Sequence, residues 1–211
     1  MTLSGLDPVA RGADRAVYFH PDYKNILFKV LLSREDLALS GFRGLSLKLF
    51  PSTRARAILK EYACFVRLQT RGWTKSGDIP VSRLYGFAQT DIGTASIVER
   101  VHCDDGPIGP TLSDLKRKGA FSSEHLVLLN DFAARILSWQ VRTTDMNMNN
   151  IAYGEREGRP QFVLVDGIGD TFAIPIRTWS LFAMKKGQAE SFTKIARELG
   201  LNWNESRWRF E

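Results

Sequence analysis

The chain has 211 residues, 44% of them hydrophobic and 25% charged, with 29 Lys and Arg against 23 Asp and Glu. This length allows one domain or a two-lobed unit with a real core, and the composition is that of an ordinary globular protein. Two cysteines argue against a disulfide-stapled secreted fold, and no run approaches the roughly 20 apolar residues of a membrane span. Residues 1–12 lack the features of a signal peptide. We expect a cytoplasmic protein whose basic surplus tolerates an anionic partner.

The first predicted element is a hairpin. Two apolar and aromatic runs, at residues 17–19 and 26–32, flank a turn that contains Pro, Asp and Asn. A polar turn with one glycine, Gly12, precedes it. The connection at residues 33–51 has a mixed pattern that fixes no structure.

A long helix and two more strands follow. The helix is predicted from Ser52 or Thr53, which are good N-cap residues, to Gly72, a common type of helix stop. Strands are predicted at residues 81–89 and 94–101. Together with the hairpin, these elements predict a small antiparallel sheet carrying one helix.

The second half of the sequence is mainly helical. Its predicted elements are a Pro- and Gly-rich connector at 102–110, a short helix at 111–118, a long helix from Ser122 or Ser123 to Arg142, and a hairpin with strands near 151–153 and 161–165. Five apolar residues of the long helix recur at the spacing of one helical face: Leu126, Leu129, Ala133, Ile136 and Leu137. Three tryptophans near the end, Trp179, Trp203 and Trp208, are expected to pack the last helices.

Lys29 stands in the middle of a predicted apolar strand, on the face that also carries Leu27 and Leu31. Burying an ammonium group is costly unless it is paired, so this position predicts an acidic partner. The alternative is an edge-strand lysine that prevents aggregation.

The candidate partner is Glu61. In the predicted helix it lies on the same stripe as Ile58, Phe65 and Leu68, which is otherwise apolar. The alternative is a boundary glutamate that reaches solvent.

The strongest motif combines Asp145 with Asn150 five residues later, followed by an apolar run that ends in Asp166-Gly167. A kinase-type site places a base and two magnesium ligands in this order. Asp145 would accept the proton of an attacking hydroxyl, and Asn150 and Asp166 would hold magnesium, which prefers oxygen ligands. The alternatives are a helix-terminating turn at Asp145 and a strand-ending Asp-Gly turn at Asp166.

The order of these features resembles the protein-kinase-like fold. More narrowly, the sequence resembles the YrbL-like proteins of the PhoP regulatory network family, found in Gram-negative bacteria. The likeness is carried by residues 12–30, 86–106 and 165–169. It extends over about residues 10 to 172.

This resemblance implies a two-lobed α+β fold: an N-lobe at residues 1–100, with an antiparallel sheet and one main helix, and a short, mainly helical C-lobe at residues 101–211. It also implies ATP in the cleft, with Lys29 contacting the α- and β-phosphates and pairing with Glu61. The backbone of residues 99–101 would meet the adenine. The implied nucleotide-binding residues are Gly12, Ala13, Asp14, Arg15, Val17, Lys29, Glu99 and Val101.

The sequence also departs from the protein-kinase pattern. The phosphate loop has one glycine where kinases usually have three, and Thr143 and Thr144 replace the His and Arg that precede the catalytic acid. No Ala-Pro-Glu segment follows, and only 41 residues remain after Asp170. This favours a small or carbohydrate acceptor over a long peptide, or no transfer at all.

Two functional hypotheses stay open. The first is a magnesium-dependent ATP phosphotransferase with an unidentified hydroxyl acceptor, linked to PhoP regulation or the cell envelope; a small molecule, a saccharide or a protein could be the acceptor. The second is a pseudokinase that binds a partner or regulates without transferring phosphate. The retained site residues favour the enzyme. Peripheral membrane contact is compatible with the charge, whereas nucleic acid is supported by charge alone and is not the expected partner.

Overall fold

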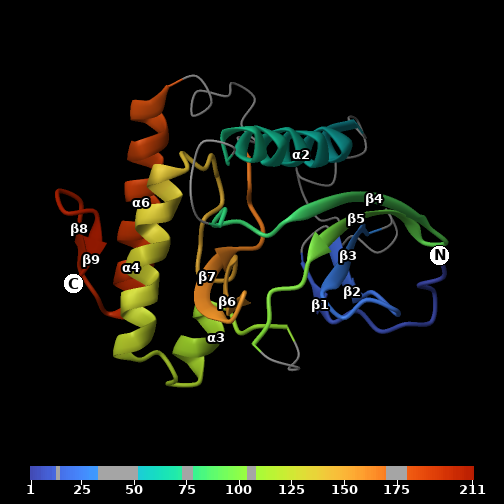
Figure 1. Ribbon diagram of the computed structural model, residues 1–211, viewed down its shortest axis with the longest axis horizontal. Coiled ribbons are helices and arrows are strands. Elements are labelled where there is room, and N and C mark those ends of the chain that lie inside the picture. The colour runs from blue at the N-terminus through green and yellow to red at the C-terminus, as the bar shows by residue number, and fades with distance from the viewer. Residues whose placement is uncertain (13–14, 33–51, 73–77, 104–107, 170–179) are drawn as a thin grey trace, which may run out of the picture. The chain divides into compact units, whose positions relative to one another are not determined.

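The computed structural model describes residues 1–12, 15–32, 52–72, 78–103, 108–169 and 180–211. The chain divides into two compact units: Met1–Ile58 with Arg83–Arg100, and Leu59–Ser82 with Val101–Glu211 (Figure 1). Residues 59–82, which the sequence interpretation assigned to the first lobe, thus group with the second unit. The lobe boundaries at residues 100 and 101 stay a prediction. The predicted connection 33–51, Ala13, Asp14 and Trp179 lie outside the described residues.

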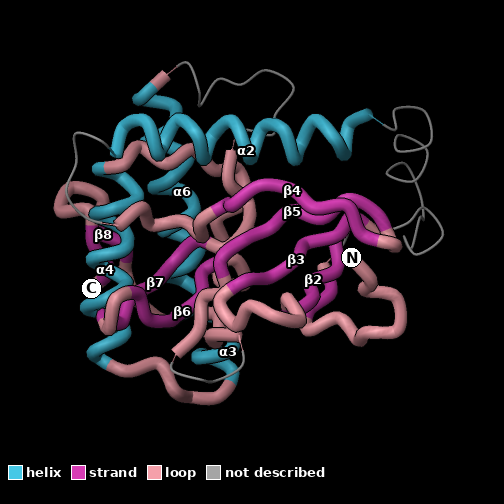
Figure 2. The backbone as a smooth tube through the Cα atoms, turned by 45° about the vertical axis from the view of Figure 1, so that its right-hand side comes forward, coloured by secondary structure: helices cyan, strands magenta, loops and turns pink. Residues whose placement is uncertain are grey.

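In the described part of the chain, the first unit is an antiparallel sheet with strand order β1-β2-β3-β5-β4 (Figure 2). Its strands are β1 (Ala10–Arg11), β2 (Arg15–Phe19), β3 (Ile26–Leu31), β4 (Leu84–Thr90) and β5 (Gly93–Glu99). The predicted hairpin is confirmed as β2 and β3. β1 was not predicted, because two residues are too few to show a periodic pattern.

The core of this unit includes the N-terminal segment of the chain. Its buried members are Leu3, Phe28, Val30 and Ala95. Leu3 is held by Asp91, in the turn between β4 and β5, whose two carboxylate oxygens accept the amide N–H groups of Leu3 at 2.6 Å and Ser4 at 3.0 Å. These hydrogen bonds lower the pKa of Asp91 to about 2, and the bond from Leu3 has the largest effect.

β4 begins at Leu84, three residues later than the strand predicted from Val81. Val81 instead forms a parallel bridge with Leu164, and Ser82 donates its amide N–H to the Leu164 carbonyl at 2.9 Å. The buried Arg156 donates to the Val81 carbonyl at 2.7 Å. The backbone groups at 81 and 82 are therefore used within the second unit, which explains the late start of β4.

The predicted long helix is confirmed as α2 (Ser52–Gly72). Phe65 and Leu68 are 2% exposed, and Ile58 and Glu61 are half-buried, so the predicted stripe faces the protein. The helix ends beside Trp139: a Cβ at Gly72 would lie 3.2 Å from the Trp139 ring.

The short helix is confirmed as α3 (Leu112–Arg117). Thr111 is its N-cap, and Thr111 and Asp114 form a reciprocal capping box, with the Thr111 amide N–H donating to Asp114 at 3.1 Å and the Thr111 hydroxyl accepting from the Asp114 amide at 3.1 Å. The hydrogen bonds from Thr111 lower the pKa of Asp114.

The long second-half helix, α4 (Ser123–Ser138), starts as predicted but ends four residues before Arg142. Gln140 adopts a left-handed conformation with φ of 51°, which a continuing helix excludes. Leu129, Ala133 and Ile136 are fully buried as predicted, together with Phe132. Residues 139–142, which were predicted as helix, instead belong to the irregular segment that leads to Asp145.

A second hairpin follows, with β6 (Ile151–Arg156) and β7 (Arg159–Leu164). Both strands extend further toward the turn than predicted, because the loop is only Glu157 and Gly158, with φ values of 53° and 71°. Such two-residue loops suit the twist of a hairpin. Gly154, predicted as loop, lies within β6, where a Cβ would come within 2.8 Å of the His102 amide nitrogen.

The chain ends with α6 (Leu181–Leu199) and the short hairpin of β8 (Trp203–Asn204) and β9 (Arg209–Phe210). Trp203 packs on Phe192 with a ring-centroid separation of 4.7 Å and on Trp208 at 5.3 Å. The predicted packing role is thus confirmed for Trp203 and Trp208. No helix formed by the described residues is long and apolar enough to cross a membrane.

Candidate functional site

Asp145 lies in the irregular segment between α4 and β6. Its side chain is exposed, whereas the flanking Met146 and Met148 are buried, so this segment is anchored from below. Asn147 donates to one oxygen of the Asp145 carboxylate at 2.8 Å. Asn150 donates to the other oxygen at 3.2 Å and to the Asp145 carbonyl at 2.8 Å. The helix-terminating alternative for Asp145 is wrong, because α4 ends at Ser138.

The second predicted acid, Asp166, follows directly on the end of β7. Its carboxylate accepts the amide N–H of Gly167 at 2.8 Å, which is also the strand-ending turn that the sequence allowed. Gly167 has φ of +75°, and a Cβ there would lie 2.6 Å from the Asp145 carbonyl oxygen. Glycine is therefore required on both conformational and steric grounds. This turn is connected to Asn150, whose carbonyl accepts the Val165 amide at 2.8 Å.

Two further residues fix the Asp145 segment to the Asp166 turn. The buried Thr143 donates its hydroxyl to the Gly167 carbonyl at 2.7 Å and forms an antiparallel bridge with Ile168. The Arg142 carbonyl accepts the Gly169 amide at 2.7 Å. Sequence reasoning treated Thr143 only as a departure from the kinase pattern; nothing in its spacing signals this bond. Asp145, Asn150 and Asp166 thus belong to one hydrogen-bonded assembly.

The Glu61 region of α2 packs on the same assembly. Gly169 has φ of +100°, and a Cβ there would lie 3.3 Å from the Lys60 carbonyl oxygen and 3.5 Å from the Glu61 amide nitrogen. One turn further on, the Cys64 thiol donates to the Arg142 carbonyl at 3.8 Å. Burial raises the pKa of this thiol. The backbone at Glu61 therefore lies beside Gly169, three residues after Asp166.

Lys29 lies on the central strand of the first unit's sheet, with Val17 opposite on β2 and Ser96 opposite on β5. It is only 8% exposed. Because β3 has a strand on each side, the edge-strand explanation for this lysine is wrong. A cation held at this depth is costly in the absence of favourable electrostatic contacts. The pairing of Lys29 with Glu61 stays a prediction.

The predicted phosphate loop connects β1 and β2. The Gly12 amide donates to the Arg15 carbonyl at 2.8 Å, which closes the turn. A Cβ at Gly12 would lie 3.6 Å from that oxygen, an ordinary contact. Val17 follows on β2. Among the described residues, this turn therefore imposes no need for glycine.

Hydrogen bonds to neighbouring segments hold the predicted adenine segment, residues 99–101, in place. Glu99 donates its amide to the Arg83 carbonyl at 2.8 Å and accepts the Arg83 amide with its carboxylate at 2.9 Å. The Arg100 amide donates to the Asn25 carbonyl, and the Val101 carbonyl accepts the Gly109 amide, both at 2.8 Å. Adenine binding here would have to use other backbone groups of the segment.

The described residues contain no group of three or more His, Cys, Asp or Glu placed to hold a metal. The predicted ligands are instead one carboxylate, that of Asp166, and one carboxamide, that of Asn150. Their backbones are linked, because the Asn150 carbonyl accepts the amide N–H of Val165, the residue before Asp166. Both offer the oxygen atoms that magnesium prefers, and nucleotide phosphates commonly complete such a shell.

This architecture defines a protein-kinase-like fold, and solved structures confirm it. The kinase domain of PknI from Mycobacterium tuberculosis is similar with a TM-score of 0.53 and 12% identity, covering 90% of this chain and 70% of that one. A second structure of the same domain gives a TM-score of 0.50 with 12% identity, over 90% of this chain and 72% of that one. At this identity the likeness shows the fold alone.

The sequence places the chain more narrowly. Residues 1–200 match the model of the family described as PhoP regulatory network protein YrbL, and the chain belongs to this family. YrbL of Escherichia coli (strain K12) is 25% identical over 192 residues, covering 88% of this chain and 81% of that protein. The YrbL protein of Shigella flexneri matches equally well. The resemblance inferred from the sequence is confirmed.

Proposed function

We propose that this protein is a magnesium-dependent ATP phosphotransferase that acts on a hydroxyl group. The observation that carries the proposal is the assembly of Asp145, Asn150 and Asp166, whose segments are joined by direct hydrogen bonds in a protein of kinase-like fold. Phosphoryl transfer asks little covalent chemistry of a protein and depends on positioning and charge. A pre-organised set of oxygen ligands and one acceptor for a proton meets that demand.

In this mechanism Asp145 orients the acceptor hydroxyl and takes its proton. The hydroxyl oxygen bonds to the γ-phosphorus, the bond from that phosphorus to the β,γ-bridging oxygen breaks, and ADP leaves. The Asp145 carboxylate accepts two hydrogen bonds from Asn147 and Asn150. A carboxylate has about four acceptor positions, so capacity remains for the substrate.

Asn150 and Asp166 would hold magnesium, which when bound neutralises phosphate charge. Lys29 would supply a second cation to the α- and β-phosphates, with Glu61 as its partner. The remaining nucleotide-binding assignments, Gly12, Ala13, Asp14, Arg15, Val17, Glu99 and Val101, belong to this proposal. The acceptor is a small molecule, a saccharide or a protein, and the family name suggests a link to PhoP regulation.

A direct test compares ATP turnover with magnesium in wild type, Asp145→Ala and Asp166→Ala. We expect Asp145→Ala to lower turnover by about 10²- to 10⁴-fold, the usual contribution of a general base. Glu198→Ala, which removes an exposed carboxylate at the end of α6, is the matched control and should retain full turnover. Wild-type turnover in Asp145→Ala would refute the mechanism.

The competing function is that of a pseudokinase. The Gly12 position favours it, because a Cβ there would make only an ordinary contact, 3.6 Å from the Arg15 carbonyl oxygen. Nucleotide binding separates the possibilities. A nucleotide present at one hundred times its dissociation constant stabilises a protein by about 2.7 kcal/mol. We expect magnesium and ATP to raise the melting temperature of wild type but not of Lys29→Ala. Stabilisation without any turnover would favour the pseudokinase.

A further inference from the structure

α6 carries a groove on the side away from the Asp145 assembly. Gln188, on the buried side of α6, donates to the Val141 carbonyl at 2.8 Å, close to the start of the Asp145 segment. Lys186 and Glu190 are each two residues away, which is about 200° of helical rotation. These two residues line a cavity of about 600 Å³. The cavity is therefore distinct from the candidate site.

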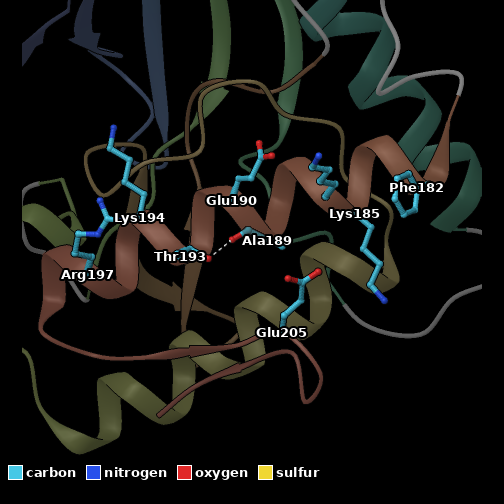
Figure 3. A pocket seen from close by; sticks show the side chains of 9 residues that line it. Phe182, Lys185, Ala189, Glu190, Thr193, Lys194, Arg197 and Glu205 are labelled. Atoms are coloured by element: carbon cyan, nitrogen blue, oxygen red, sulfur yellow. Dashed lines mark hydrogen bonds between the residues drawn. The ribbon is translucent and has the colours of Figure 1, made fainter.

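The groove has a small floor and charged edges (Figure 3). Ala189 and Thr193 form the floor, where the Thr193 hydroxyl donates to the Ala189 carbonyl at 2.9 Å. Figure 3 shows Glu190 and Lys194 projecting from one side of α6 and Glu205 lying on the other. A concave surface of this kind suits a ligand that lies along the helix.

The charge of the groove is unbalanced. Four cations, Lys185, Lys186, Lys194 and Arg197, line it together with two carboxylates, Glu190 and Glu205, which leaves a surplus of two positive charges.

The spacing of Lys186, Glu190 and Lys194 would permit helical ion pairs. Within the described part of the chain, however, their side chains and that of Arg197 make no ion pair or hydrogen bond. Only Lys185 is engaged, with its Nζ 5.3 Å from the centre of the Trp208 ring.

The positions of the cations indicate an extended ligand. Lys186 and Arg197 are eleven residues apart, which corresponds to about 16 Å along a helix. A single small anion cannot reach both ends. Lysine and arginine are the usual partners of phosphate oxygens. At one end of the groove, Phe182 is 79% exposed and offers an apolar contact.

We propose that the α6 groove binds the phosphate groups of an extended anionic ligand, either a soluble phosphorylated molecule or the headgroups of anionic lipids. This binding site is separate from the proposed phosphotransferase site and does not depend on transfer activity. The two sources of phosphate share the same recognition chemistry, and the experiment below separates them.

The first measurement titrates the ¹⁵N-labelled full-length chain with inorganic tripolyphosphate, followed by NMR at moderate salt. We expect the largest shift changes at residues 182–197, and we expect them to persist in Lys29→Ala, which disables the proposed nucleotide site. The double variant Lys194→Glu/Arg197→Glu should bind about tenfold more weakly or worse. The NMR spectrum of each variant verifies its fold.

The matched control is Lys118→Glu/Arg159→Glu, which changes the net charge equally at two exposed positions outside the groove. It should bind within about twofold of wild type. An equal loss of affinity in both double variants, shift changes confined to residues outside α6, or binding of neither tripolyphosphate nor vesicles would overturn the proposal.

Vesicle flotation identifies the source of the phosphate. Binding of wild type to phosphatidylglycerol vesicles but not to phosphatidylcholine vesicles, with loss in Lys194→Glu/Arg197→Glu, supports lipid headgroups. Binding of tripolyphosphate without flotation supports a soluble ligand. Because none of these readouts measures phosphoryl transfer, failure of the proposed enzyme activity and failure of the groove are distinguishable.

Discussion

Two glycine turns contain residues predicted to act in the site, one turn in each unit, and they are built differently. At Gly167 the backbone is left-handed with φ of +75°, and a Cβ would come within 2.6 Å of the Asp145 carbonyl oxygen. At Gly12 the nearest atom to a Cβ would be the Arg15 carbonyl oxygen, 3.6 Å away. The fold therefore requires glycine at position 167, whereas at position 12 glycine is allowed but not required.

The two turns also differ in how many hydrogen bonds hold them in place. The segments of the proposed base and magnesium ligands are joined by hydrogen bonds that involve Thr143, Arg142 and Asn150. The described part of the phosphate turn is closed by the hydrogen bond between Gly12 and Arg15. We infer that the protein's own hydrogen bonds specify the Asp145 and Asp166 segments more strongly than the Gly12 turn.

Gly167→Ala should produce the largest loss of stability. A left-handed non-glycine residue costs about 1–2 kcal/mol, and displacement of the Asp145 backbone adds to this, so we expect about 2–4 kcal/mol in chemical denaturation. The control is Gly158→Ala, where φ is +71° but nothing lies within 4 Å of the added Cβ. Equal costs at the two positions would show that the contact with Asp145 does not restrict the turn.

Thr143→Val tests the bond between the Asp145 segment and the Asp166 turn. It preserves the shape of the side chain but leaves the Gly167 carbonyl without its 2.7 Å partner, so we expect a loss of about 1–2 kcal/mol. Thr193→Val, at an exposed position of α6, removes a hydroxyl that donates to the Ala189 carbonyl of the same helix, and it should change stability by less than about 0.5 kcal/mol. A Thr143 variant as stable as the Thr193 variant would contradict the structural role assigned here.

Asp91 gives the first unit a defined acid response. Its pKa in the folded protein is about 2, below the ordinary value of 3.8, so the ionised form stabilises the fold. That stabilisation is complete above the ordinary pKa and is lost as pH falls through about 4 toward 2. NMR should show the Leu3 and Ser4 amides losing protection in this window. Asp91→Asn should remove most of this dependence, and an unchanged profile in that variant would assign it to other groups.

Gly12→Ala should have the smallest effect. The turn accommodates a Cβ, so we expect stability within about 1 kcal/mol of wild type and no substantial change in affinity for magnesium and ATP. Calorimetric titration and a melting curve measure both. A large loss of nucleotide affinity at unchanged stability would show that the Gly12 backbone contacts phosphate after all, which would remove the contrast between the turns.

Much of the fold can be predicted from local sequence. α2, α3 and the β2–β3 hairpin follow from caps, turns and hydrophobic spacing, because these signals lie within a few residues of each element. The errors arise where distant residues decide. β4 starts late because Arg156 and Leu164 take the backbone groups at 81 and 82. Gly154 was predicted as loop but lies in β6. The glycine is needed there because the backbone of His102 occupies the space that a side chain would fill.

For the candidate site, the order of acids and amides along the sequence singled out Asp145, Asn150 and Asp166. The structure joins their segments by hydrogen bonds, and their roles stay a prediction. The order could not indicate the supporting bonds from Thr143 and Arg142, since a hydroxyl or a carbonyl bound to a distant backbone leaves no periodic pattern. The alternation of exposed Asp145 with buried Met146 and Met148 is a signal that could have indicated the anchored segment.

The close packing of Gly169 on α2 has a mechanical consequence. With the Lys60 carbonyl 3.3 Å from where a Cβ would be, no side chain separates the helix from the turn. Movement of this part of α2 toward the turn would press directly on the backbone of Gly169, three residues after Asp166. Glu61 and the proposed magnesium ligand Asp166 are thus linked through one backbone contact, with no side chain in between to absorb the movement.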